Sequence, residues 1–343
     1  MGLAAPTTDR PAGEGRGFKD AAADLRALIG PDLDRVDAAI VECMGSSAPL
    51  IPEVAGHLVR SGGKRLRPML TLAAAKLCGY EGAEHIKLAA SVELIHGATL
   101  LHDDVVDASA LRRGAKTANI IWGNKESVLV GDYIFSRAFE LMVAARNLDV
   151  LRILSTASGI IAEGEVLQLA TQKNLSATFD MYLAVVESKT AALFAAATEA
   201  GAVIAGASEA LAEALRSYGR NLGVAYQLVD DALDYAGYES TLGKRVGDDF
   251  REGKMTLPVV YAIGRASAEE ATFWKRTIAD GRQDGRDFAH ACEILERTGA
   301  LADTLTCAHR YAGRALADLR NMPGNAFSRA LADLAETSVS RGF

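Results

Sequence analysis

The sequence predicts an all-α fold. Apolar residues recur at helical spacing along almost the whole chain, for example over residues 73–77 and 88–101. Only eight of the 343 residues are proline and alanine is abundant, so few positions would interrupt a helix. No run of alternating β-branched residues flanked by turn residues stands out. We therefore expect helices throughout the chain.

A single helical domain is expected over residues 18–343, because no break in composition and no long polar linker follows residue 20. Residues 1–17 are rich in glycine, proline, threonine and charge, which predicts a disordered tail. This tail has no apolar core and therefore is not a signal peptide. Residues 264–299 are polar and charged and are expected to form peripheral helices with loops.

Charge and cysteine usage limit the partners and the compartment. The net charge of −7 argues against nucleic acid as a partner. The longest apolar runs are interrupted before they reach the roughly 20 residues of a membrane span, so we expect no transmembrane segment. The four cysteines are scattered without a CxxC pair, as expected for reduced thiols in a cytoplasmic protein.

Two copies of one acidic pattern lie far apart, and each ends an apolar helical stretch. The first, DDVVD, covers residues 103–107, and the second, DDALD, covers residues 230–234. In each copy the first and last aspartates are four residues apart and share one helix face. Carboxylates on an apolar segment repel one another and are costly to bury unless a cation is bound. Oxygen ligands of this kind suit Mg²⁺, which commonly bridges carboxylates to substrate phosphates.

Basic residues near the acidic clusters favour a metal–diphosphate site over the ordinary alternative, two solvated acidic helix ends. A single DDxxD is a weak signal, but two that both end apolar helical runs should occur by accident in roughly one chain in a few hundred. The basic residues are Lys64 and Arg67 in GGKRLRP, Arg112 and Arg113 after the first cluster, and Lys244 and Lys254 after the second. Paired guanidinium groups bind phosphate in a bidentate manner, which suits a small polyanion.

The chain resembles the trans-isoprenyl (polyprenyl) diphosphate synthases over roughly residues 20–343, and is similar to the bacterial octaprenyl to decaprenyl type. The motifs that carry the resemblance, in order, are GGKRLRP, HGATLLHDDVVDASALRRG, GDYIFSRA, ESKTAALF, YQLVDDALDY and GKRVGDDFREGKMTLP. The resemblance implies one large bundle of antiparallel helices around a central cavity. It also implies an enzyme that condenses isopentenyl diphosphate repeatedly onto an allylic diphosphate such as farnesyl diphosphate.

The resemblance also implies roles for individual residues. The predicted ligands of Mg²⁺, with about three ions bound beside the allylic diphosphate, are Asp103, Asp104, Asp107, Asp230 and Asp234. The predicted allylic-diphosphate residues are Arg112, Lys189, Thr190, Gln227, Lys244 and Lys254. Isopentenyl diphosphate would bind without metal through Lys64, Arg67, His96 and Arg113. The residues expected to act in catalysis are Asp103, Asp107, Asp230, Lys189, Thr190 and Gln227.

Several assignments have ordinary alternatives. His96 lies two turns before Asp103 on the same face and could be a packed core residue. Lys254 could be a plain surface lysine. A class I terpene cyclase or a head-to-head squalene or phytoene synthase would not need the GGKRLRP element. A non-catalytic partner subunit of a polyprenyl synthase would typically lose one acidic cluster, and this chain keeps both.

The residues one turn before the first cluster predict a long product. Thr99 and Ala98 lie four and five positions before Asp103 and are small, so nothing bulky would close a product tunnel there. Phe135 and Phe139 are then the candidates for the tunnel floor. A helix of 20–25 residues spans about 30–38 Å, enough for about eight to ten prenyl units. We expect an octaprenyl to decaprenyl product for the ubiquinone side chain, with geranylgeranyl diphosphate as the alternative.

The expected assembly is a homodimer, as the resemblance implies. With 49% hydrophobic residues the chain has enough apolar surface for a helix-packed interface. The helix around residues 114–138 is expected to lie near that interface. Transient membrane contact during product release is left open by the sequence.

Overall fold

The fold is helical, as predicted. The structure, a computed structural model, describes residues 16–236 and 246–341. Within these ranges the only paired strands are β1 (Leu111–Arg112) and β2 (Ala115–Lys116), which form a short antiparallel hairpin. Arg113 and Gly114 form its turn, with φ angles of 53° and 79°. Positive φ at both turn residues matches the twist of a tight hairpin.

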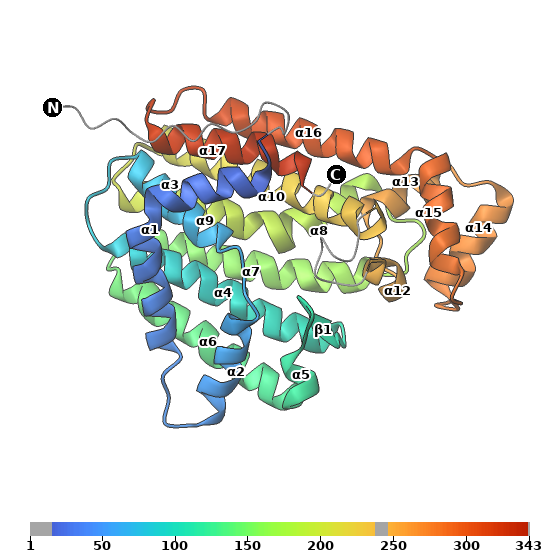
Figure 1. Ribbon diagram of the computed structural model, residues 1–343, viewed down its shortest axis with the longest axis horizontal. Helices are drawn as coiled ribbons and strands as arrows, with labels where there is room; N and C mark the ends of the chain where they lie inside the picture. The colour runs from blue at the N-terminus through green and yellow to red at the C-terminus, as the bar shows by residue number, and fades with distance from the viewer. Residues whose placement is uncertain (1–15, 237–245, 342–343) are drawn as a thin grey trace.

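Helices account for the remaining elements (Figure 1). The first part of the chain forms α1 (Phe18–Cys43), α2 (Leu50–Arg60), α3 (Leu66–Leu77), α4 (Glu84–Val106), α5 (Ala118–Ile121), α6 (Asn124–Ala144) and α7 (Leu148–Thr171). The middle part forms α8 (Phe179–Val186), the π-helix η1 (Glu187–Ala191), α9 (Ala192–Ile204) and α10 (Glu209–Ala236). The last part forms α12 (Asp248–Glu252), α13 (Leu257–Gly264), α14 (Ala268–Trp274), the π-helix η2 (Lys275–Ala279), α15 (Asp287–Arg297), α16 (Ala300–Asp318), α17 (Ala326–Thr337) and the 3₁₀-helix η3 (Ser338–Ser340).

The first helix, α1, follows the predicted N-terminal tail in the sequence. Residues 1–15 lie outside the described residues, and α1 begins at Phe18. Arg16, within the predicted tail, already contacts Asp333 of α17 at 2.7 Å. α1 buries one side chain every three or four residues, from Phe18 to Cys43, so it is an amphipathic helix on the outside of the bundle.

α3 forms the centre of the bundle. Almost every residue of this helix is buried, as expected for a helix surrounded by others. α9 approaches it closely at Gly201, where a Cβ atom would lie only 2.4 Å from the carbonyl oxygen of Thr71. Alanine on both helices permits the same close approach along their length.

The apolar core consists of two clusters that share α10 and α16. The larger cluster packs α1, α3, α4, α6, α7 and α9 around the first half of α10. The smaller cluster packs α8, α13, α14, α15 and most of α16 around its second half. Figure 1 shows α14 and α15 projecting beyond the bundle at one end, which confirms the peripheral helices expected over residues 264–299. No helix within the described ranges is long and apolar enough to cross a membrane.

Candidate active site

The first acidic cluster lies at the C-terminal end of α4. Asp103 and Asp104 occupy its last turn, and Asp107 is the C-cap residue. The helix ends there because Ala108 takes a left-handed conformation with φ of 50°. The helix dipole is negative at this end, so carboxylates here are destabilised unless a cation is close.

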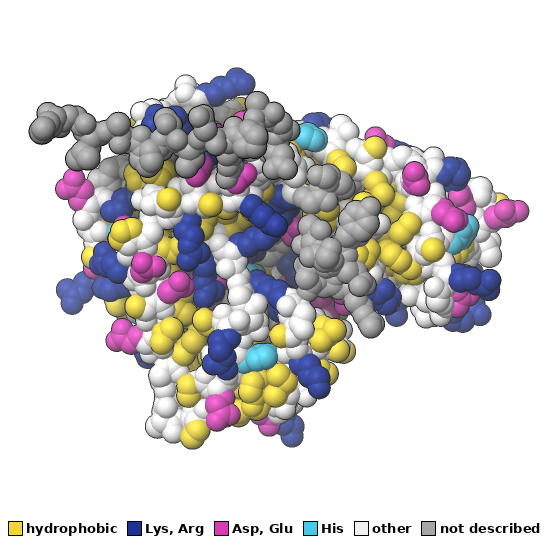
Figure 2. All heavy atoms as spheres, in the orientation of Figure 1, with side chains coloured by type: hydrophobic (Ala, Val, Ile, Leu, Met, Phe, Trp, Pro, Cys, Tyr) yellow, Lys and Arg dark blue, Asp and Glu magenta, His cyan; other side chains and the backbone are white. Residues whose placement is uncertain are grey.

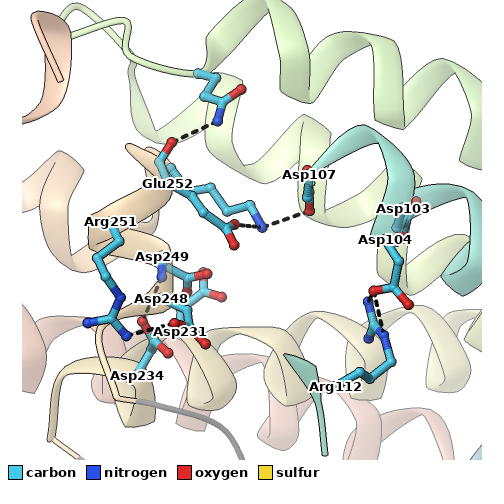
Figure 3. Close-up of polar contacts among 12 residues, drawn as sticks. Asp103, Asp104, Asp107, Arg112, Asp231, Asp234, Asp248, Asp249, Arg251 and Glu252 are labelled. Atoms are coloured by element: carbon cyan, nitrogen blue, oxygen red, sulfur yellow. Dashed lines mark hydrogen bonds and ion pairs between the residues drawn. The ribbon is translucent and has the colours of Figure 1, made fainter. Parts of the chain in front are cut away.

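Arg112 contacts the middle aspartate of this cluster (Figure 3). Its Nε and Nη2 atoms lie 2.9 and 2.8 Å from Asp104 Oδ1. Asp104 is only 2% exposed, and its backbone carbonyl accepts a hydrogen bond from Asn119. The pair therefore attaches the β1–β2 hairpin to the end of α4 and leaves Asp103 and Asp107 as the more accessible carboxylates.

A π-helix brings Lys189 to the first cluster. Lys189 Nζ lies 2.7 Å from Glu165 Oε2 on α7 and 3.7 Å from Asp103 Oδ2. Gly164 permits this approach, because a Cβ atom there would lie 2.8 Å from the Ser188 Cβ. The extra residue of a π-turn is a common feature of functional sites.

The second acidic cluster lies near the C-terminal end of α10. Asp230 Oδ1 is 3.0 Å from Arg341 Nη1, and the guanidinium of Arg341 lies 3.5 Å from the centre of the Tyr226 ring. Asp234 is fully buried, and its Oδ2 accepts the amide of Asp249 at 3.0 Å. Asp234 therefore holds the start of α12, away from the more open Asp230.

α12 and Lys254 connect the two clusters. Figure 3 shows Asp103, Asp104 and Asp107 at one side of the site and Asp231, Asp234, Asp248 and Asp249 at the other. Lys254 Nζ lies 3.0 Å from Asp107 Oδ2 and 2.5 Å from Glu252 Oε2. Lys254 is thus part of the site rather than a plain surface lysine.

The acidic residues fit a bound cation. Burial raises the pKa of Asp103; Lys189 opposes this rise, while Glu165 and Asp107 add to it. Burial likewise raises the pKa of Asp231. A divalent cation would favour the ionised forms, and hard oxygen ligands suit Mg²⁺ or Ca²⁺. Within the described ranges no three acidic, histidine or cysteine residues form a ready-made metal site, so these carboxylates fit a cation that is shared with a ligand.

A separate basic pocket lies beside α3 and the hairpin. Figure 2 shows lysine and arginine side chains gathered around a hollow in the middle of this face. Lys64, Arg67 and Arg113 have no carboxylate within 4 Å among residues 16–236 and 246–341. Arg67 Nε is buried without a hydrogen-bond partner, and burial lowers the pKa of Arg67. Burial, and then the charge of Arg67, lower the pKa of His96 well below its usual value. Such a pocket fits an anion.

Arg65 holds this pocket in shape. It takes a left-handed conformation with φ of 51°, which is strained for a residue with a side chain. Its guanidinium lies 3.0 Å from Asp37 Oδ1 on α1 and 2.6 Å from Glu93 Oε1 on α4. These two ion pairs neutralise the nearby Asp37 and Glu93, and Lys64, whose Nζ lies 3.4 Å from the Tyr226 hydroxyl, has no carboxylate partner within the described ranges.

A cavity of about 150 Å³ joins the polar and apolar parts of the site. Lys189, Thr190 and Gln227 line it together with Asp231 and Lys254. Its other wall is largely apolar and includes Val185, Val186 and Met255. Thr190 Oγ1 donates to Gln227 Oε1 at 2.9 Å. The cavity can therefore hold a charged head group at one side and hydrocarbon at the other.

Comparison of the sequence with known proteins identifies its family. The sequence profile described as "Polyprenyl synthetase" matches residues 48–295. The chain belongs to the polyprenyl synthetase family. It is 43% identical to the octaprenyl diphosphate synthase of Escherichia coli K12 over 318 residues, which cover 92% of this chain and 98% of that protein. The predicted family and its fold are therefore confirmed.

Two solved structures of the family resemble this chain closely. One is a polyprenyl synthase from Caulobacter crescentus CB15 complexed with calcium and isoprenyl diphosphate, with a TM-score of 0.92, 51% identity, and coverage of 96% of this chain and 100% of that one. The other is a decaprenyl diphosphate synthase from Rhodobacter capsulatus, with a TM-score of 0.90, 51% identity, and coverage of 94% and 99%.

The predicted chain-length residues of this polyprenyl synthetase lie on α4 and α6. Ala98 is fully buried, and the Thr99 hydroxyl donates to the His96 carbonyl at 2.8 Å. Phe135 and Phe139 are half-buried on α6, with ring centres 5.2 Å apart. None of the four lines the cavity at Lys189.

Four residues that lie at this candidate site were not predicted from the sequence: Glu165, Tyr182, Glu252 and Arg341. Arg341 is separated from Asp230 by 111 positions, and no local pattern points to it. Glu165 follows a glycine and Glu252 precedes one, but neither neighbour indicates the lysine that each glutamate contacts. Those contacts depend on how the helices pack. Lys244, a predicted diphosphate residue, lies outside the described residues.

Proposed function

We propose that this chain is a Mg²⁺-dependent trans-polyprenyl diphosphate synthase that makes a long-chain, octaprenyl to decaprenyl product. The carrying observation is that the two acidic clusters lie at one site, connected by α12 and Lys254, beside a basic pocket whose Lys64, Arg67 and Arg113 have no carboxylate partner among the described residues. A cyclase needs one diphosphate site, whereas chain elongation needs two. The direct test is an assay of the purified protein with isopentenyl and farnesyl diphosphates and Mg²⁺, with the products resolved by chain length.

Asp103, Asp107 and Asp230 would hold Mg²⁺. When bound, the ions neutralise the diphosphate that leaves the allylic substrate. Lys189 lies 3.7 Å from Asp103 and Lys254 lies 3.0 Å from Asp107, so both lysines could contact the same diphosphate. Asp104 and Asp234 support the site through Arg112 and the amide of Asp249.

Thr190 and Gln227 are proposed to face the allylic carbon, because both line the cavity beside Lys189. Their oxygen atoms would stabilise positive charge in the hydrocarbon. Isopentenyl diphosphate would bind in the pocket of Lys64, Arg67, His96 and Arg113, where no metal is needed. The released diphosphate is the proposed acceptor of the proton lost after condensation.

Replacing Asp103 should abolish most of the turnover. Asp103→Ala is expected to lower kcat/KM by more than about 100-fold, roughly 3 kcal/mol of transition-state stabilisation, because one electrostatic contact of the leaving group is lost. Asp34→Ala, an exposed aspartate of α1, is the matched control and should leave the rate unchanged. Steady-state kinetics with both substrates measure the effect. Near-normal turnover of Asp103→Ala would disprove the assignment.

Lys64 should separate the two diphosphate sites. Lys64→Ala is expected to weaken isopentenyl diphosphate binding by about 1.5–3 kcal/mol and leave allylic-substrate binding nearly unchanged, because Lys64, unlike Lys189 and Lys254, contacts no described carboxylate of the first acidic cluster. Lys19→Ala on exposed α1 is the control. Calorimetric titration of each substrate measures the difference. Equal weakening of both would mean that the two sites have been confused.

We also propose a homodimer formed through α6 and α7. These helices expose large apolar side chains, including Leu129 at 68%, Val143 at 62% and Val166 at 66%. Apolar patches of this kind on a soluble chain commonly mark an interface. Leu129 lies within the range expected from the sequence.

Light scattering tests the dimer. Leu129→Glu should shift the chain to monomer, because a carboxylate would be buried without a partner in the interface. Val41→Glu on α1, where Val41 is 62% exposed, should leave the mass unchanged. A monomeric unmodified chain would contradict the proposal.

Product length tests the path of the growing chain. Thr99→Phe is expected to shorten the product to about three or four prenyl units, because the helix rises only about 6 Å between residue 99 and Asp103. Thr99→Val, which keeps the size of the side chain, should leave the product unchanged. Chromatography of the extracted products gives the answer. An unchanged product from Thr99→Phe would mean that the chain takes another path, and a geranylgeranyl product from the unmodified chain would favour the alternative function.

The proposed location is the cytoplasm, with the product used for the ubiquinone side chain. Four free cysteines within the described ranges agree with a reducing compartment. Residues 18–343 are proposed to act as one domain, with transient membrane contact as the route of product release.

A further inference from the structure

A chain of hydrogen bonds connects a buried tyrosine to the catalytic pair. Tyr182 on α8 donates its hydroxyl to Asp231 Oδ2 at 2.6 Å. Gln227 Nε2 donates to Asp231 Oδ1 at 2.7 Å, and Thr190 donates to Gln227 Oε1 at 2.9 Å. The four residues come from α8, η1 and α10 and all line the same cavity.

The chemistry of the four groups fixes the direction of this chain. The amide of Gln227 turns its NH₂ group toward Asp231 Oδ1, because an amide nitrogen only donates hydrogen bonds and an amide oxygen only accepts them. Its oxygen then faces Thr190, whose single hydroxyl proton is used in that bond. The remaining lone pairs of Thr190 and Gln227 are thus available to the cavity, and neither oxygen needs to present a proton there.

Burial makes Tyr182 well suited to hold this arrangement. Tyr182 is 6% exposed and Asp231 is 3% exposed, so water competes little for the bond between them. Asp231 would otherwise have one oxygen without a donor from α8, and its carboxylate could rotate about the bond to its own Cβ. Rotation of the Asp231 carboxylate would also break the hydrogen bond that Gln227 Nε2 donates to it.

We propose that Tyr182 is a positioning residue for ionisation of the allylic substrate, acting through Asp231 to orient the Gln227 and Thr190 oxygens toward the developing cation. This inference rests on the proposed roles of Gln227 and Thr190. Because the Tyr182 hydroxyl is engaged by Asp231, removal of that hydroxyl should affect the rate of the chemical step and leave both binding steps intact.

A double-mutant cycle tests the proposal. Tyr182→Phe keeps the ring and removes only the hydroxyl, and is expected to lower kcat roughly tenfold with both KM values within about twofold. Tyr218→Phe is the matched control, because Tyr218 is also fully buried and its hydroxyl donates to the Leu331 carbonyl at 2.8 Å, away from Gln227. It should lower the Tm and leave kcat unchanged.

The second arm of the cycle uses Gln227→Leu. If Tyr182 acts through Gln227, Tyr182→Phe should cause no further loss of kcat in the Gln227→Leu background. A purely structural tyrosine would instead give multiplied losses in the double variant. If Tyr182→Phe fails to fold, Asp231→Asn breaks the same chain at its centre and should show the same absence of additivity with Gln227→Leu.

The outcomes separate this inference from the proposed function. No condensation by the unmodified chain would refute the function itself. A normal Gln227→Leu variant would refute the role of Gln227 and, with it, that of Tyr182. A normal kcat for Tyr182→Phe, equal losses in Tyr218→Phe, or multiplied losses in the double variant would each overturn this inference alone.

Discussion

The cost of burying like charges governs the arrangement of this site. Both acidic clusters end apolar helices, and the first also lies at the negative end of the α4 dipole. Aspartates in these places are unfavourable unless positive charge lies beside them. The fold supplies that charge from distant segments: Lys189 from η1, Lys254 after α12 and Arg341 after η3. The helices around the cavity are therefore held together by ion pairs as well as by apolar packing.

Lys189, Lys254 and Arg341 pair with the aspartates that are proposed to bind metal. A metal ion bound to those carboxylates would compete with Lys189 and Lys254 for them, and both lysines would then be placed to contact a diphosphate. The basic pocket differs, since Arg65 pairs with Asp37 and Glu93, and Lys64 and Arg67 have no carboxylate partner in the part of the chain that the structure describes. One site would thus exchange counterions on ligand binding, and the other would accept an anion directly.

The sequence was sufficient for the fold class and for the groups whose spacing is local. Helical periodicity predicted the bundle, and the DDxxD and GGKRLRP spacings place their residues together because one helix or turn carries each set. Sequence reasoning failed where partners come from elements far apart in the chain, as for Arg341, Glu165 and Tyr182. The β1–β2 hairpin was missed because two-residue strands leave no pattern of alternation. Whether Ala98 and Thr99 line the product path depends on how α4 packs on α6, which spacing alone does not encode.

α10 contributes its first half to one apolar cluster and its second half to the other. Each cluster includes buried residues of α10, so neither cluster is expected to fold as an autonomous unit. Unfolding should then be a single cooperative transition rather than two. A cavity-forming substitution in the smaller cluster, remote from α4, would lower the melting temperature of the whole chain and loosen the second acidic cluster with it.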